Sequence, residues 1–187
     1  MHVSVLFQHL VSLIHCSNET LRLMPAVLAV LRRWVPKGSG GIFVSGRYAS
    51  ESVRVATLLS YFYRFIPEET EIFVPPYCIQ RNPQYFYPLS DTFWPERWII
   101  SQKEDEKQPQ TFVHNLAAFI PFSFGPMNCV GKQLAYREMR IVIASILRHF
   151  DICFADGYDA DKWFEEMHDD MILAKGDLPV VLTKRVN

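Results

Sequence analysis

A ten-residue loop, F-S-F-G-P-M-N-C-V-G over residues 122–131, runs directly into an amphipathic stretch and limits the folds open to this chain. From Gly131 to Phe150 apolar residues recur at the 3.6-residue spacing of a helix, so we expect one helix there. Cys129 would lie at the start of that helix, where free backbone N–H groups and the helix dipole favour a thiolate. A thiolate binds metals or attacks electrophiles.

Two glycines and two phenylalanines shape the surroundings of this cysteine. Gly125 permits a tight turn with positive φ, and Gly131 removes a side chain where a flat group can press against the helix. Phe122 and Phe124 supply an apolar wall that keeps water from the sulfur. A nucleophilic cysteine needs a neighbouring histidine base, and the loop contains none. A redox cysteine or a buried structural cysteine remains an alternative from these residues alone.

The composition is that of a globular protein. Of the 187 residues, 49% are hydrophobic and 21% are charged, which excludes a disordered chain. The net charge of −1 gives no reason to expect nucleic-acid binding. The four cysteines form no C-x-x-C pair and the six histidines have no zinc-binding spacing, so we expect reduced thiols and no zinc site built from protein ligands alone.

Two short motifs precede the cysteine loop. E-T-L-R places Glu19 and Arg22 on one face of a helix, because residues three apart are neighbours there. P-E-R-W follows at residues 95–98, with V-P-P-Y at residues 74–77 in between. In this order, the motifs and the F-x-x-G-x-x-x-C-x-G loop resemble the C-terminal part of the cytochrome P-450 family of haem-thiolate monooxygenases, most closely its fungal members.

The resemblance implies a cofactor and a structural network. Cys129 would be the axial thiolate of the iron of haem b, in a cofactor-binding loop whose other matching residues are Phe122, Gly125 and Gly131. No catalytic residue is expected beyond this ligand. Glu19, Arg22 and Arg97 would form a buried network of charged side chains. One position departs from the family: Met127 stands where a basic residue usually pairs with a haem propionate, which weakens the expected retention of haem.

The expected fold is mixed α/β, mainly helical with small, mostly antiparallel sheets, and it corresponds to a truncated P-450 fold. A helix should end before Pro25, since proline clashes with the preceding turn. Residues 80–100 should form an irregular meander, and residues 101–111 a solvated loop. The strand candidates are residues 26–35, 42–44, 71–77, 151–154 and 178–184.

We expect one partial P-450 domain over residues 1–187, with residues 18–46 and 65–185 matching the family. Residues 1–17 do not match it, and they are described well neither by a signal peptide nor by a membrane span. Residues 48–64 interrupt the match. They are either a surface insertion, which loops tolerate, or a translated intron, because the codons for Arg47-Tyr48 and Tyr63-Arg64 can contain splice sites.

The resemblance implies a monooxygenase that inserts oxygen from O₂ into a small apolar substrate, with electrons from an NADPH-dependent reductase. The intact family member would lie at the cytosolic face of the endoplasmic reticulum membrane, and no membrane anchor is expected in these residues. Lys132, Arg137 and Arg140 form either a reductase dock or a solvated helix face. Residues 26–31 and 171–178 are candidates for substrate contact. The chain alone is expected not to hydroxylate; the alternative is a non-catalytic haem-binding or pseudogene-like fragment.

Overall fold

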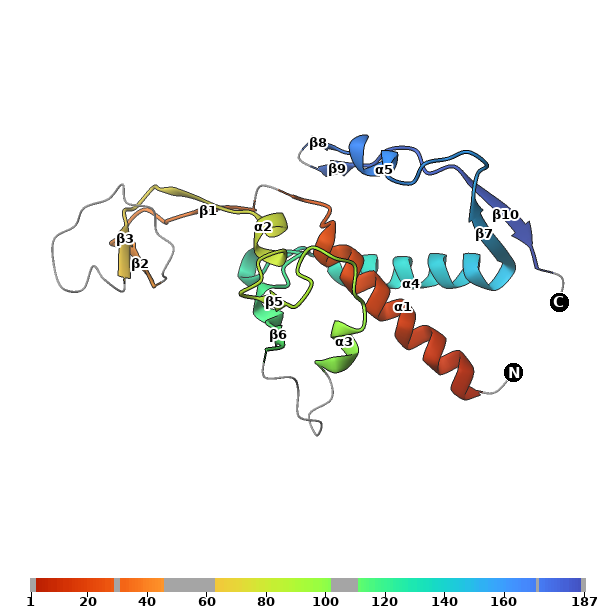
Figure 1. The fold of residues 1–187 in the computed structure, drawn as a ribbon. Coiled ribbons are helices and arrows are strands. Elements are labelled where there is room, and N and C mark those ends of the chain that lie inside the picture. Colours follow the sequence, from red (N-terminus) through yellow and green to blue (C-terminus); the bar gives the residue numbers. More distant parts are fainter. Residues whose placement is uncertain (1–2, 29–30, 46–62, 102–110, 171, 186–187) are drawn as a thin grey trace. The chain divides into compact units, whose positions relative to one another are not determined.

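The computed structural model describes residues 3–28, 31–45, 63–101, 111–170 and 172–185. The chain forms two compact units, residues 30–74 and the remainder, 1–29 with 75–187. Figure 1 shows the elements of each unit. The proposed interruption at residues 48–64 and the loop at 101–111 lie almost wholly outside the described residues.

The described residues of the unit 30–74 form two short antiparallel ladders. Each strand pairs with one partner, so each ladder has two strands: β1 (Leu31–Trp34) with β4 (Glu71–Val74), and β2 (Ile42–Ser45) with β3 (Tyr63–Ile66). The turn after β1 contains Gly38 and Gly40 at positive φ, a conformation that favours glycine. The Glu68 carboxylate accepts hydrogen bonds from both of their N–H groups and so fixes this turn.

Two of the strand predictions are too long. After Pro25 the chain passes through bends as far as Leu28, and the described strand begins only at Leu31, where β4 offers a partner. The strand predicted over residues 71–77 ends at Val74, because Pro76 begins the helix α2 (Pro76–Gln80). Proline has no N–H for a ladder but fits the first turn of a helix. Valine and leucine content therefore overstated the first strand, and the second was extended past the prolines that end it.

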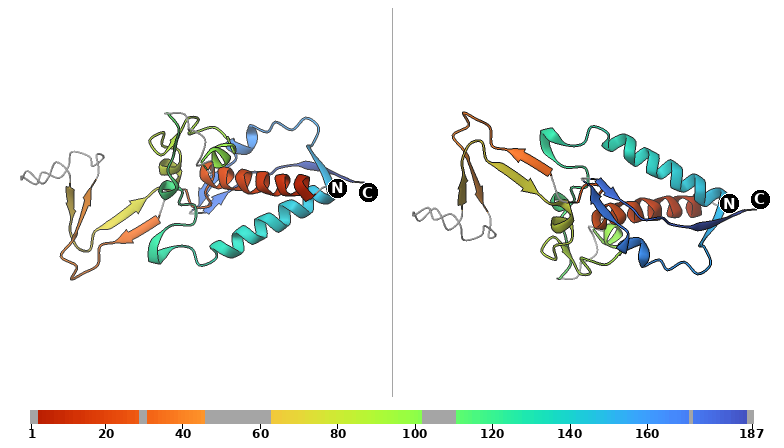
Figure 2. Two further views of the ribbon diagram at one scale, coloured as in Figure 1. Left: turned by 90° about the horizontal axis from the view of Figure 1, so that it is seen from below. Right: turned by 90° about the horizontal axis from the view of Figure 1, so that it is seen from above.

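Two long helices dominate the other unit. The helix α1 (Val3–Leu23) ends just before Pro25, as predicted. The helix α4 (Lys132–His149) follows the cysteine loop and occupies almost the whole predicted range. Both views in Figure 2 show the two helices side by side. Besides α2, the shorter helices described in this unit are α3 (Arg97–Ile100), α5 (Lys162–Glu165) and the 3₁₀ turns η2 (Leu116–Ala118) and η3 (Gly125–Met127).

Three more two-stranded ladders lie in the described residues of this unit, and all three are antiparallel. They pair β5 (Phe86–Tyr87) with β6 (Val113–His114), β7 (Phe150–Phe154) with β10 (Val180–Lys184), and β8 (His168–Asp170) with β9 (Ile172–Ala174). The predictions of small antiparallel sheets and of strands near residues 42, 151 and 180 are confirmed. That the fold is mainly helical stays a prediction.

The core lies where the end of α1 meets the meander that precedes the cysteine loop. Its buried apolar residues include Leu23, Phe86, Trp98, Ala118 and Ile120. By contrast, α4 has no buried residue along its described length. Among the described residues, no helix has the length and apolarity needed to cross a membrane.

Candidate functional site

The cysteine loop is closed by its own backbone and leaves the thiol at the surface. The N–H of Cys129 donates to the carbonyl of Phe122 at 2.9 Å, and its carbonyl accepts from the N–H of Lys132 at 3.3 Å. Ser123 and Gly125 have φ of 62° and 69°, which turns the chain back on itself. Cys129 is exposed and directly precedes α4. The loop therefore presents one sulfur at the N-terminal end of a long helix.

The loop that carries this sulfur also exposes apolar side chains. Met127 is 71% exposed and Val130 is 102% exposed, while Phe122 packs on Tyr136 with ring centroids 5.1 Å apart. A Cβ on Gly131 would meet only the Cys129 sulfur, at 3.8 Å, which is ordinary van der Waals contact. Glycine at this position relieves no clash within the chain, but it keeps the space beside the sulfur clear. A flat apolar group fits such a face.

The described residues suit a metal cofactor that itself supplies most of the ligands of its metal. Among the described residues, no three His, Cys, Asp or Glu side chains gather around a common metal position. A metal at Cys129 would thus have one soft protein ligand, and the cofactor would fill its other positions. Haem held by one axial thiolate meets this condition. The thioether of Met127 offers no positive charge to a haem propionate.

Glu19 is the centre of a buried network of hydrogen bonds. Its carboxylate oxygens accept from the Arg22 guanidinium, Nη2 to Oε1 at 2.8 Å and Nε to Oε2 at 3.0 Å. Arg97 Nε donates to Oε1 at 3.0 Å, and Trp98 Nε1 donates to Oε2 at 2.9 Å. The side chains of Glu19, Arg22 and Arg97 are all 0% exposed. The structure thus brings together α1 and α3 through three charges.

Further donors of the network reach the meander. Arg22 Nη1 donates to the carbonyl of Gln80 at 2.7 Å, and Arg97 Nη2 donates to the carbonyl of Leu89 at 2.8 Å. Gln80 is buried as well: its amide nitrogen donates to Arg22 O, and its amide oxygen accepts from Ile120 N–H at 2.7 Å. Ile120 lies just before the cysteine loop. Through Gln80, the network therefore supports the segment that leads into Cys129.

Burial and charge perturb the titrating groups of this network. Burial raises the pKa of Glu19, but hydrogen bonds and charge from Arg22, together with the charge of Arg97, outweigh it and hold the pKa below its ordinary value. Burial lowers the pKa of Arg97, because it disfavours the charged guanidinium. His114 donates from Nδ1 to the carbonyl of Arg97 at 3.2 Å, and burial lowers its pKa to about 4. His114 is therefore neutral near pH 7.

Sequence reasoning named the three charged residues of the network but missed Gln80, Trp98 and His114. A lone glutamine in the five-residue α2 or a lone histidine in the two-residue β6 gives no periodic signal, because these elements are too short to show one. On α4, Lys132 is half-buried, whereas Arg137 and Arg140 are exposed. The guanidinium of Arg140 lies 5.6 Å from the centroid of the Tyr136 ring.

Comparison with known proteins assigns the chain to a class. The family model described as cytochrome P-450 matches residues 46–178. The chain belongs to the cytochrome P-450 family.

The curated relatives are fungal. Cytochrome P-450 monooxygenase phqL of Penicillium fellutanum is 33% identical over 90% of this chain and 25% of its own length. Cytochrome P-450 67 of Uromyces fabae is 36% identical over 77% of this chain and 23% of its own. Tryprostatin B 6-hydroxylase of Aspergillus fumigatus is 30% identical over 90% of this chain and 25% of its own. The chain thus spans about a quarter of these relatives' length.

A solved structure shows the same fold. The haem domain of a cytochrome P450DA mutant superposes with a TM-score of 0.65 at 17% identity, over 93% of this chain and 32% of that chain. The expectation of a P-450-type fold is confirmed over the matched part.

Proposed function

We propose that Cys129 is the axial ligand of haem b and that the chain is the haem-binding part of a monooxygenase. The observation that carries the proposal is the exposed Cys129 thiol at the N-terminal end of α4, in a loop closed by the bond from its own N–H to Phe122. Family membership and the monooxygenase and hydroxylase names of the relatives support it. When bound, haem supplies O₂ activation for oxygen insertion into an apolar substrate, with electron density from the thiolate.

The residues of the chain hold and shield the ligand. Ser123 and Gly125, both at positive φ, turn the loop back on itself, and the N–H of Lys132 fixes the carbonyl of Cys129. Phe122 and Phe124 would form the apolar wall beside the bound cofactor, which would limit access of water to the iron ligand. Gly131 keeps the neighbouring surface flat. Cys129, Phe122, Gly125 and Gly131 are therefore the proposed cofactor-binding set.

The Glu19, Arg22 and Arg97 network acts as a frame in this proposal. Because its charges are 0% exposed and mutually paired, removal of one partner leaves an uncompensated buried charge. Gln80 connects the frame to Ile120, directly before the loop. The network positions the loop and does not touch the cofactor-binding face.

For these 187 residues alone we propose haem binding without turnover. Oxygen insertion needs groups that deliver protons and a site that excludes water. In the part of the chain that the structure describes, Cys129, Met127 and Val130 lie on an open face instead. In the intact family member, an NADPH-dependent reductase at the cytosolic face of the endoplasmic reticulum membrane would deliver electrons, with Arg137 and Arg140 on α4 as part of its dock.

Haem reconstitution tests both parts of the proposal. The wild-type chain should bind haem with thiolate-type absorption, and Cys129→Ser should lose that absorption. Cys153→Ser is the matched control, since Cys153 is also exposed but lies on β7. Thiolate-type absorption that survives in Cys129→Ser would refute the ligand assignment. Monooxygenation by the isolated chain with a reductase supplied would refute the proposed lack of turnover.

A further inference from the structure

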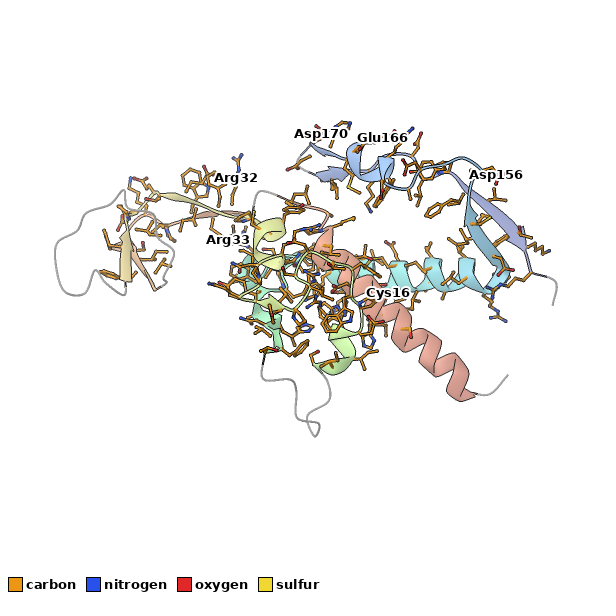
Figure 3. All side chains as sticks on the ribbon, in the orientation of Figure 1. Cys16, Arg32, Arg33, Asp156, Glu166 and Asp170 are labelled. Carbon is orange, nitrogen blue, oxygen red and sulfur yellow. The ribbon has the colours of Figure 1, made fainter. Side chains whose placement is uncertain are left out.

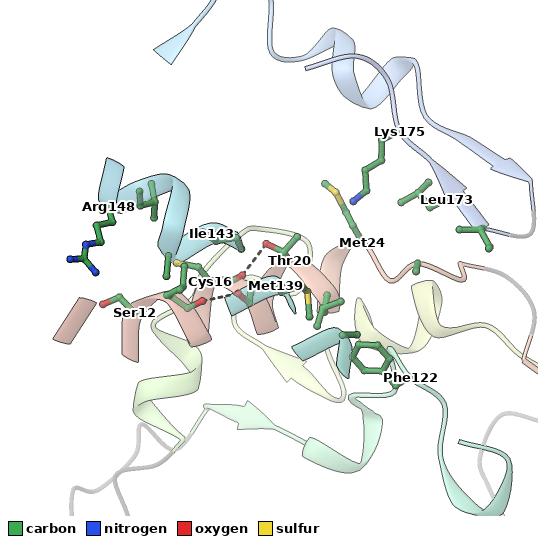
Figure 4. Close-up of a pocket in the computed structure, with 18 of the residues that line it drawn as sticks. Ser12, Cys16, Thr20, Met24, Phe122, Met139, Ile143, Arg148, Leu173 and Lys175 are labelled. Atoms are coloured by element: carbon green, nitrogen blue, oxygen red, sulfur yellow. Dashed lines mark hydrogen bonds between the residues drawn. The ribbon is translucent and has the colours of Figure 1, made fainter. Parts of the chain in front are cut away.

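The ring of Phe122 is in contact with an aromatic side chain of α4. The carbonyl of Phe122 accepts the N–H of Cys129 at 2.9 Å, which ties its backbone to the proposed iron ligand. Its side chain lines an apolar cavity between α1, α4 and the tail of the chain (Figure 4). The same ring packs on Tyr136, with centroids 5.1 Å apart and ring planes inclined by 56°. Phe122 therefore borders the cavity and Tyr136 at once.

Tyr136 has a second neighbour on its own helix. Arg140 follows four residues later, and side chains at this spacing lie next to each other on a helix. The guanidinium carbon of Arg140 lies 5.6 Å from the centroid of the Tyr136 ring, within the range of a cation–π contact. Arg140 is exposed, whereas Tyr136 is half-buried. A row of contacts thus runs from the exposed face of α4 through Tyr136 to Phe122.

The contact between Tyr136 and Phe122 depends on the ring of Tyr136. Burial raises the pKa of the Tyr136 phenol above its ordinary value, and the charge of Arg140 offsets this only in part, so the phenol is neutral near pH 7. Neutral aromatic rings prefer tilted or offset arrangements, and the inclination of 56° fits that preference. A phenylalanine at position 136 keeps such a contact, whereas an aliphatic side chain does not.

We propose that Tyr136 is a positioning residue for the haem ligand, because its ring holds Phe122 in the wall beside the cofactor. The inference rests on the proposed function, in which Cys129 binds the iron and Phe122 belongs to that wall. Hydrogen bonds and solvent at a ligating sulfur tune the iron behind it. When Phe122 loses its support, water reaches the Cys129 sulfur and donates hydrogen bonds to it. The sulfur then gives less electron density to the iron, which favours the reduced state.

A redox titration of the haem-loaded 187-residue chain measures this effect, with dithionite donating one electron to each ferric iron. Tyr136→Leu keeps an apolar side chain without the ring, and it should shift the midpoint potential to a more positive value. Tyr136→Met is a second ringless variant and should give a shift of the same sign. Tyr136→Phe retains the ring and should keep the wild-type potential. The matched control is Ile141→Leu, at a 66% exposed position of α4, which should leave the potential unchanged.

A double-mutant cycle tests whether Tyr136 acts through Phe122. Phe122→Leu alone should shift the midpoint potential in the same direction as Tyr136→Leu. Because the two rings are in contact and share one effect, Tyr136→Leu should add no further shift in the Phe122→Leu background. A purely structural role of Tyr136 predicts lower stability in its ringless variants, but not this pattern of potentials.

Two results would overturn the inference alone. The first is an unchanged potential in both ringless variants that retain thiolate-type absorption. The second is additive shifts from Tyr136→Leu and Phe122→Leu, which would mean that Tyr136 acts independently of the wall. A wild-type chain that binds haem without thiolate-type absorption would instead refute the proposed function and this inference with it, so the two failures are distinguishable.

Discussion

Glu19 accepts hydrogen bonds from Arg22, Arg97, Trp98 and the backbone N–H of Trp94, and it has no contact with solvent. Such a carboxylate is satisfied only while every partner is present. The two motifs that contain Glu19, Arg22 and Arg97 could be recognised from the sequence because their spacing is fixed. Gln80 and His114, which complete the same cluster, could not, since their burial depends on how the short elements α2 and β6 pack.

Loss of one charge should therefore cost far more here than at the surface. Arg97→Met should lower the free energy of unfolding by ~3–5 kcal/mol, because Glu19 loses a buried partner. Arg185→Met removes an exposed pair with Asp151 and should cost ~1 kcal/mol or less. Urea unfolding of the full chain measures both. Similar losses in the two variants would show that the network is not the frame proposed.

His114 should make stability depend on pH. Burial lowers its pKa from 6.5 to about 4 in the folded chain, so between these values the unfolded chain binds the extra proton. Stability should be full above pH 6.5, fall as the pH drops towards 4, and lose roughly 1–3 kcal/mol from this group. His114→Phe should flatten urea-unfolding stability between pH 7 and 5. An unchanged pH slope in that variant would exclude His114 as its source.

Met127 should limit how tightly haem is retained. Met127→Arg places a cation where the family usually pairs one with a propionate, and a charge-assisted hydrogen bond at this exposed position is worth ~1 kcal/mol. Haem dissociation should slow about fivefold. Met127→Leu, which keeps the size and adds no charge, should leave the dissociation rate unchanged. Equal rates for the arginine and leucine variants would argue against a propionate near residue 127.

Among the elements, α4 shows that sequence periodicity predicts where a helix lies but not which residues cover it. The 3.6-residue spacing predicted a helix over residues 131–150, and the structure has it over Lys132–His149. The pattern identifies an apolar face but not what covers it, so the exposure of α4 could not be predicted. The strand prediction over residues 26–35 was too long for a related reason: its apolar composition favours a strand, but only a pairing partner such as β4 fixes where the strand lies. Within β1 the alternation is regular, and Figure 3 shows Arg32 and Arg33 on opposite sides of it.

Apolar residues on the outer face of α4 should contribute little to the stability of the isolated chain. Ile141 and Val142 are 66% and 53% exposed, so the double change to lysine should alter the free energy of unfolding by less than ~1 kcal/mol. Trp98→Ala, in the core, should cost ~3–5 kcal/mol. Urea unfolding of the two variants compares them directly. A large loss from the α4 variant would mean that this face is covered in the isolated chain.

At the scale of the whole molecule, the chain is a piece of P-450 fold that spans about a quarter of its curated relatives' length. Different interactions stabilise its two units. The unit of residues 30–74 contains short strand ladders, and the other unit contains the buried Glu19 network. The family and the small antiparallel sheets could be inferred from ordered motifs. The cavity between α1 and α4 could not, because it depends on the spacing of two helices far apart in sequence.

X-ray absorption at the iron edge of the haem-loaded chain tests the central claim most directly, because it reports the atoms bound to the metal. The account predicts a sulfur scatterer at bonding distance in the wild-type chain and in Cys153→Ser, and its loss in Cys129→Ser. Only nitrogen and oxygen scatterers in the wild-type chain, or a sulfur that persists in Cys129→Ser, would contradict Cys129 as the haem ligand.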